Sequence, residues 1–599
     1  MRKVKVYMYI GILTSLLLVG CNDSYLDRTP ETSITEANFF KSDNDLELYS
    51  NQFYSYFYNN ASCGVAMTDA PSDNAVNSNT IGEVYSLMSG SVTPENVGKW
   101  NWEDIRTVNF MIARAGNATG SKVNHYIGLA RLTRALLYYN KVLTYSDVPW
   151  YSRDLQTTDN DLLYKTQDSR ALVCDSIVAD VDYAIQNMKT AADLGGNHTY
   201  LSKDVALAVK ARICLQEASW RKYHPELKLN DADKFYEMSI SACQQLMQMG
   251  YSLCSDYEGL FRNTSLVGNP EVILYEDYDR GLSLLWGYND QFGGGNAGLS
   301  KDLFDSYLYI NASGEAVPYT SIEGYNTKSI TEGFENRDPR LKSTFLYPGW
   351  VRPSSDGQSY VQYLNSILGY QSIKWEPMYN NGNTIGYGPG NNCFGDVSKY
   401  RFGEILLIYA EAKAELGQLT QTDLDMTINK LRDRVGMPRA SLSNWLGNID
   451  PVLNAKYSNV NSSQKGAVLE IRRERRVELA NEGFRVSDLY RWSMGKTFEN
   501  QGKGLYVGTK LPVELDLTAD GKPDIAVVST QAEKDAYQAK GITAYIVGVD
   551  NFLVTDDGYL EPSDAKGRYT FKEPADYYTP ISVQDIQLNP NLVQNPYWQ

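Results

Sequence analysis

Residues 469–492 read LEIRRERRVELANEGFRVSDLYRW, and the charges in this stretch indicate how the chain folds. Glu470 and Arg473, and likewise Arg475 and Glu478, stand three positions apart, which makes each pair neighbours on a helix surface. We expect one helix over the first part, which carries Glu470 to Glu478, and a polar cluster of Arg485, Asp488 and Arg491 after it. The charges would form a salt-bridge lattice that locks the last helices together. The alternative interpretation of the clustered arginines is an anion-binding site.

Apolar residues recur at helical spacing in five further stretches, which are 125–145, 168–188, 203–220, 231–248 and 401–417. Asp168 or Ser169 stands where it can cap the second stretch, and Gly417 ends the fifth. The helices form two blocks, at about 44–249 and about 401–482. Polar connections link consecutive helices in the manner of tetratricopeptide-like hairpins, although no strict repeat period is visible.

Between and after the helical blocks the composition changes to Gly, Asn, Pro, Ser and Tyr. These loop-rich segments cover about 251–399 and about 503–599 and include GGGN at 293–296. Long irregular segments in a folded protein usually carry function. The predicted fold is therefore mainly α, a tetratricopeptide-like helical-hairpin scaffold that presents large irregular loop regions.

The N-terminus has the pattern of an export signal. Basic residues at positions 2, 3 and 5 precede an apolar run over 6–19. This run is too short to span a bilayer comfortably, since a spanning helix needs roughly 20 apolar residues. It ends in Leu18-Val19-Gly20-Cys21, which resembles the bacterial lipobox and implies cleavage before Cys21 and lipidation of its thiol. The alternative is an ordinary signal peptide with a chance cysteine.

The charge balance and the metal-binding residue types exclude several function classes. The chain carries 56 Lys and Arg against 72 Asp and Glu, which argues against nucleic acid as a partner, because its backbone demands basic patches. Three histidines and seven scattered cysteines without a CxxC pair predict neither a metal site nor a cofactor. The stretch 516–524 partly resembles a calcium loop, but Val527 stands where a glutamate is needed, so a turn at Asp520-Gly521 is predicted.

Six stretches carry a resemblance to a known family, and they are 25–40, 130–150, 336–347, 399–417, 469–492 and 577–598. In this order, and over nearly the whole chain, they resemble signatures of the SusD/RagB outer-membrane lipoproteins of Bacteroidetes. The second stretch reads ARLTRALLYYNKVLTYSDVPW, with Ser146 in place of the usual glycine.

The resemblance implies an organisation and a role. A signal peptide over 1–20 would precede a single SusD-like domain over 21–599, exposed on the surface of the outer membrane. Such a protein binds an oligosaccharide and caps a SusC-type TonB-dependent transporter for nutrient import. Peptide binding in the same position, as in the RagB branch, is the alternative.

Enzymatic activity is the third possibility, in the form of a surface glycosidase. A glycosidase needs two carboxylates roughly 5–10 Å apart, and acidic residues abound. No hydrolase signature such as GxSxG or HExxH is present, so we predict a protein that is not an enzyme and has no catalytic residues.

Candidate ligand-binding residues lie in two loop regions. Asp73 and Asn74, within DAPSDNAVNSN at 69–79, have planar polar side chains that suit hydroxyl pairs, with an Asx turn as the alternative. Tyr85 follows shortly after. Trp286 and Tyr288 precede the glycine run, and all three aromatic rings suit stacking on a sugar face. Packing of these rings on the scaffold is the alternative.

A Cys21→Ala protein is expected to bind its ligand in solution but to fail to support uptake. The reason is that acyl chains hold a protein on a membrane, with about 0.8 kcal/mol contributed per buried methylene. Growth of a strain that carries the variant, with the ligand as nutrient, measures uptake. Full growth of the Cys21→Ala strain would show that uptake does not need the lipid anchor.

Overall fold

A computed structural model describes residues 39–58, 69–77, 83–98, 100–279, 281–285, 297–351, 370–375, 378–380, 383–385, 394–500, 502–550, 552–563 and 569–598. Three of the predicted site residues lie outside this part of the chain, namely Cys21, Trp286 and Tyr288, as does the whole predicted signal peptide. Their roles stay predictions.

The first helical block is a series of helices in which each long helix packs on the next. Its members are α2 (Asp43–Ser50), α4 (Glu83–Met88), α5 (Glu103–Arg114), α6 (Val123–Tyr145), α7 (Asn160–Leu163), α8 (Arg170–Asn187), α9 (Lys203–Tyr223) and α10 (Ala232–Met247). α6 packs on α8, α8 on α9 and α9 on α10. The Ser169 side chain accepts a hydrogen bond from the Leu172 amide and caps α8. The four helices predicted here are confirmed, each to within one helical turn.

The second block continues the same stack. Its members are α14 (Phe402–Glu415), α15 (Gln421–Met426), α16 (Ile428–Arg434), α17 (Leu442–Gly447), α18 (Pro451–Lys456), α19 (Lys465–Glu478) and α20 (Arg485–Arg491). α14 packs on α10 and on α19, so one hydrophobic core runs through both blocks. Gly417 has a positive φ of 70° after α14, as expected for a helix stop. α17 and α18 were not predicted, because six residues are too few for a periodic pattern.

The loop-rich segments form small sheets with short helices between them. The strands are β1 (Ala75–Asn77), β2 (Val272–Glu276), β3 (Ala297–Leu299), β4 (Tyr309–Ile310), β5 (Ala316–Val317), β6 (Met378–Asn380), β7 (Asn383–Ile385), β8 (Val397–Arg401), β9 (Val513–Leu515), β10 (Ile525–Val528), β11 (Thr543–Ile546), β12 (Phe552–Val554) and β13 (Leu560–Pro562). The helices are α11 (Lys301–Ser306), α12 (Ile330–Gly333), α13 (Arg340–Thr344), α21 (Gln531–Gln538) and α22 (Val583–Leu588). β1 pairs antiparallel with β3, with Ala75 opposite Leu299, and β2 pairs with β8.

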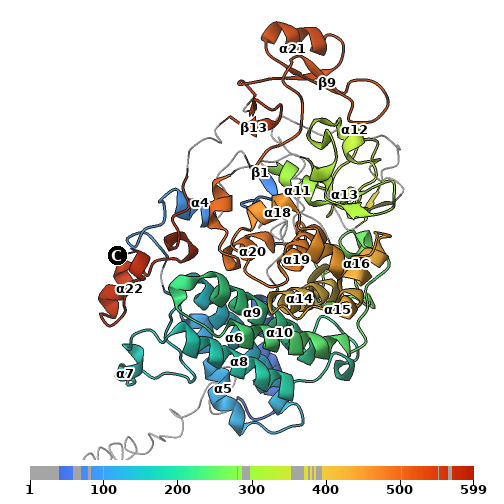
Figure 1. Cartoon of the computed structure of the whole chain (residues 1–599). Coiled ribbons are helices and arrows are strands. Elements are labelled where there is room, and N and C mark those ends of the chain that lie inside the picture. The colour runs from blue at the N-terminus through green and yellow to red at the C-terminus, as the bar shows by residue number, and fades with distance from the viewer. Residues whose placement is uncertain are drawn as a thin grey trace, which may run out of the picture.

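Figure 1 shows the first helical block at the bottom, except for α4, which lies higher in the view. The second block lies above it, and loop-rich segments lie at the top, around α11, α12 and α13. The C-terminal segment returns to the first block, where the Thr579 amide donates to the Thr144 carbonyl at 2.8 Å.

The predicted turn at Asp520-Gly521 is confirmed, since the Gly521 amide donates to the Asp516 carboxylate at 2.9 Å and Gly521 has a φ of 80°. Within the described residues, no helix combines the length and the apolar character needed to cross a bilayer.

The chain thus has a mainly α fold, in which consecutive helices stack as tetratricopeptide-like hairpins and loop-rich segments cover one end. The fold class predicted from the sequence is confirmed.

Candidate ligand-binding cleft

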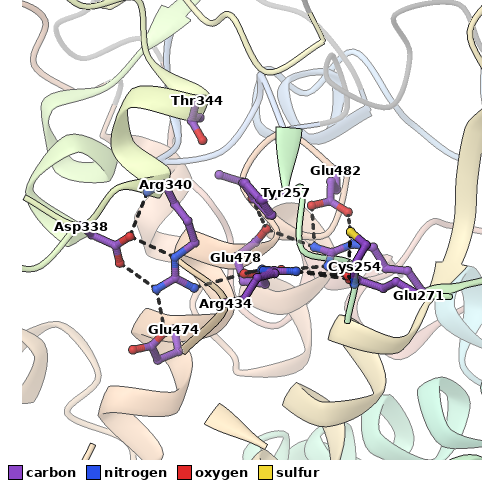
Figure 2. Close-up of polar contacts among 12 residues, drawn as sticks. Cys254, Tyr257, Glu271, Asp338, Arg340, Thr344, Arg434, Glu474, Glu478 and Glu482 are labelled. Carbon is purple, nitrogen blue, oxygen red and sulfur yellow. Dashed lines mark hydrogen bonds and ion pairs between the residues drawn. The ribbon is translucent and has the colours of Figure 1, made fainter. Parts of the chain in front are cut away.

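A buried carboxylate, that of Glu478, joins four elements of the fold. Glu478 ends α19, and its oxygens pair with Arg340 of α13 at 3.1 Å, Arg401 of β8 at 2.8 Å and Arg434 of α16 at 2.7 Å. None of the four side chains is more than 3% exposed. Figure 2 shows that Arg340 also lies between Asp338 and Glu474, which it contacts at 2.7 and 3.0 Å. Buried ion pairs therefore hold the loop-rich segments against the helical stack.

The arginines of α19 form the predicted salt-bridge lattice, but one of the two predicted ion pairs is not formed. Arg473 pairs with Glu470 at 3.3 Å, as the spacing predicts. The predicted pair between Arg475 and Glu478 is wrong. Arg475 donates instead to Asp488 of α20 at 2.8 Å, because Glu478 is turned toward the arginines of the neighbouring elements.

Two more arginines of these helices hold the polar segment before β1. Arg476 of α19 donates to the Asn74 side-chain oxygen at 2.8 Å and to the Asp73 carbonyl at 2.9 Å. Arg485 of α20 donates to both carboxylate oxygens of Asp73, at 2.7 and 2.8 Å. The lattice thus fixes the position of a segment that the sequence analysis assigned to ligand binding.

A cleft of about 610 Å³ opens beside Asp73 and the start of α11, and we call it the Asp73 cleft. Figure 1 shows the region, where β1, α11 and α18 lie close together. Six stretches of chain line the cleft, and their side chains are Asp73; Lys301, Asp302 and Asp305; Tyr325 and Asn326; Lys456; Met494, Lys496, Thr497, Asn500 and Lys503, with the backbone of Gly502; and Asp557 and Tyr559.

Positive and negative charges balance in the Asp73 cleft, since four of its side chains are lysines and four are aspartates. Lys456 lies 2.8 Å from Asp73 and also pairs with Asp302. Lys301 pairs with Asp305, and Lys503 pairs with Asp557. A ligand with a strong charge of either sign would therefore meet as much repulsion as attraction.

Aromatic rings surround one of these lysines. The Lys301 ammonium lies 5.2 Å from the ring centre of Tyr325 and 5.9 Å from that of Tyr559. Burial lowers the pKa of Lys301 below 10.5, although Asp305 opposes this shift. Tyr325 is half-buried, while Asn326 and Asn500 are exposed. The cleft therefore offers an aromatic ring and planar amide side chains that both donate and accept, which suits a neutral molecule rich in hydroxyl groups.

The structure brings one of the predicted binding residues to this cleft. Asp73 lines it, but its carboxylate is already bound by Arg485 and Lys456. Asn74 is 1% exposed, and its side-chain amide accepts a hydrogen bond from Arg476 and donates one to Asp69. Tyr85 lies on α4, is 5% exposed, and its ring contacts that of Tyr569. Ligand contact by these three residues stays a prediction.

Sequence reasoning missed most of the lining residues. Tyr325, Asn326, Lys456, Asn500 and Tyr559 stand in stretches without any motif. No spacing signal could have found them, because the tertiary structure alone brings these stretches together.

A family model described as the SusD family matches residues 270–598 of this chain. The chain belongs to the SusD family. The matched region includes α19, α20 and all of the Asp73 cleft except Asp73 itself.

Individual members are distant in sequence and share the fold. SusD-like protein P2 of Formosa agariphila is 24% identical over 83% of this chain and 92% of its own length. The crystal structure of a SusD-like carbohydrate-binding protein from Bacteroides fragilis has a TM-score of 0.65 at 21% identity, covering 93% of this chain and all of that one. A laminarin-binding SusD-like protein has a TM-score of 0.53 at 18% identity, with 93% and 99% covered.

Replacing Glu478 by Gln is expected to lower the free energy of unfolding by about 3–5 kcal/mol, because it leaves buried arginines without their shared counter-charge. Urea unfolding followed by circular dichroism measures the loss. Asp425→Asn is the matched control, since Asp425 pairs with Arg439 at 3.0 Å on the surface and a surface pair contributes about 0–1 kcal/mol. Equal losses in the two variants would contradict this account.

Acid is expected to weaken the same lattice. Burial opposes ionisation of Glu478, but Arg434, Arg401 and Arg340 outweigh it and hold the pKa of this carboxyl well below 4.5. A depressed pKa in the folded state stabilises the protein above the unfolded-state pKa, about 4.3, and this contribution is lost as pH falls further. Between pH 7 and pH 3, roughly, stability should therefore fall less steeply in Glu478→Gln than in the parent chain. If the free energy of unfolding falls equally steeply with pH in both proteins, groups other than Glu478 cause the acid sensitivity.

Proposed function

We propose that this SusD-family protein binds a neutral oligosaccharide in the Asp73 cleft at the cell surface. The observation that carries the proposal is the balance of paired lysines and aspartates in a cleft that also presents Tyr325 and exposed amides. Hydroxyl groups both donate and accept hydrogen bonds, and they carry no charge that the mixed lining would repel. Carbohydrate binding by two proteins of the same fold supports the choice of ligand class.

The protein acts as the surface component of a nutrient importer. Family membership and the lipobox-like ending at Cys21 support a lipoprotein in the outer membrane that caps a SusC-type TonB-dependent transporter. The signal peptide over 1–20 is removed, and residues 21–599 work as one SusD-like unit. The role is recognition and delivery of the oligosaccharide.

Two of the four aspartates that line the cleft are unsuited to act as a general acid, whereas burial raises the pKa of a third, Asp305, although Lys301 opposes this shift. Burial opposes ionisation of Asp73 and Asp302, but Arg476 and its neighbouring cations outweigh it and hold the pKa of both carboxyls below the ordinary value. Both are therefore ionised, and neither has a proton to give to a glycosidic oxygen, as a glycosidase would require.

Tyr325→Ala is expected to weaken oligosaccharide binding about tenfold, because it removes the half-buried ring at the side of the cleft. Isothermal titration calorimetry with maltohexaose, laminarihexaose and cellohexaose measures the affinity. Tyr164→Ala is the matched control, since Tyr164 is 49% exposed and does not line the cleft. Unchanged affinity in Tyr325→Ala for every hexaose that the parent protein binds would move the site away from the Asp73 cleft.

A further inference from the structure

A second cavity lies in the first helical block, and it shares no lining residue with the Asp73 cleft. Its volume is about 670 Å³, and it is formed by α2, by the 3-10 helix that follows it (Asn51–Tyr56), by the start of α6, by the connection before α9 and by the end of β2. We call it the His125 cavity.

Tyrosine rings make up the apolar part of the lining. Tyr54, Tyr58, Tyr126 and Tyr200 all border the His125 cavity. Tyr126 is 6% exposed, whereas Tyr200 is 48% exposed at the opening. A buried ring and an open ring thus give the cavity aromatic surface both inside and at its mouth, which suits contact with the apolar face of a pyranose.

A buried histidine supplies a free hydrogen-bond donor. His125 lines the cavity and is 5% exposed, and its Nδ1 accepts a hydrogen bond from the Lys189 amide at 3.2 Å. Burial, together with Lys189 and Lys122, lowers the pKa of His125 to about 4, so the ring is neutral near pH 7. A neutral ring that accepts at Nδ1 carries its proton at Nε2. Nε2 has no hydrogen-bond partner among the described residues, and His125 lines the cavity.

Charges around the cavity decide which ligand class fits. Four carboxylates border it, those of Glu47, Asp193, Glu276 and Asp277. They disfavour an acidic ligand. Lys122 and Lys189 border it too, and Lys399 pairs with Glu276 at 2.8 Å, so three ammonium groups offset most of the carboxylate charge that would attract a cation. Hydroxyl groups match a lining that presents both donors and acceptors.

We propose that the His125 cavity is a second saccharide-binding site, which takes one or two neutral pyranose rings between Tyr200 at its mouth and His125 at its base. The ligand class rests on the proposed function, but the location of the second site does not.

The test weakens one site at a time and titrates with maltohexaose, laminarihexaose and cellohexaose. In Tyr325→Ala, residual binding of at least one hexaose should persist. Adding Tyr200→Ala should weaken that residual binding at least about tenfold, because the exposed ring at the mouth is lost. Tyr164→Ala is the matched control for Tyr200→Ala, because these tyrosines are 49% and 48% exposed and Tyr164 does not line the cavity.

The possible results separate the two proposals. If Tyr325→Ala abolishes all binding, the second site is overturned and the Asp73 cleft stands. If Tyr325→Ala changes nothing while Tyr200→Ala abolishes binding, the second site stands and the Asp73 cleft is overturned. If Tyr200→Ala and Tyr164→Ala behave alike, the His125 cavity is overturned as a binding site. If the parent protein binds none of the three hexaoses, both assignments are overturned.

Discussion

The carboxylate of Glu478 is the constraint on which the rest of this structure depends. It is fully buried, and such a charge is tolerated only where opposite charges and hydrogen bonds surround it. Arg340, Arg401 and Arg434 meet this requirement from three different parts of the chain. Their convergence sets how the loop-rich segments sit on the helical stack, because displacing any one arginine would remove part of the counter-charge around a fully buried carboxylate.

The position of the Asp73 cleft follows from the same lattice. Arg476 and Arg485, on the helices that flank Glu478, bind the backbone and the carboxylate of Asp73. They keep β1 in place, and β1 in turn pairs with β3, which leads into α11 and its Lys301. The charged side chains of the lattice thus support the walls of the cleft, and in the proposed function the ligand meets the uncharged tyrosine rings and amides.

Local patterns were enough to predict the helical scaffold. Apolar residues at helical spacing identified α6, α8, α9, α10 and α14, because each of these helices packs against its neighbours and is long enough to show a pattern. The sequence also indicated a salt-bridge lattice, since arginines and glutamates at helical spacing are unusual in a solvated loop. It misassigned Arg475, because spacing within one helix cannot tell which partner lies on the next helix.

The order of the helices, the loop-rich segments between them and the lattice charges on α19 were therefore determined by the sequence alone, since periodicity and charge spacing are properties of neighbouring residues. The composition of the binding sites was decided only by the tertiary structure. Asp73, Lys301, Tyr325, Lys456 and Tyr559 come from five stretches without a shared motif. These stretches meet at one cleft because the chain folds around buried charged groups, and no local sequence pattern predicts those contacts.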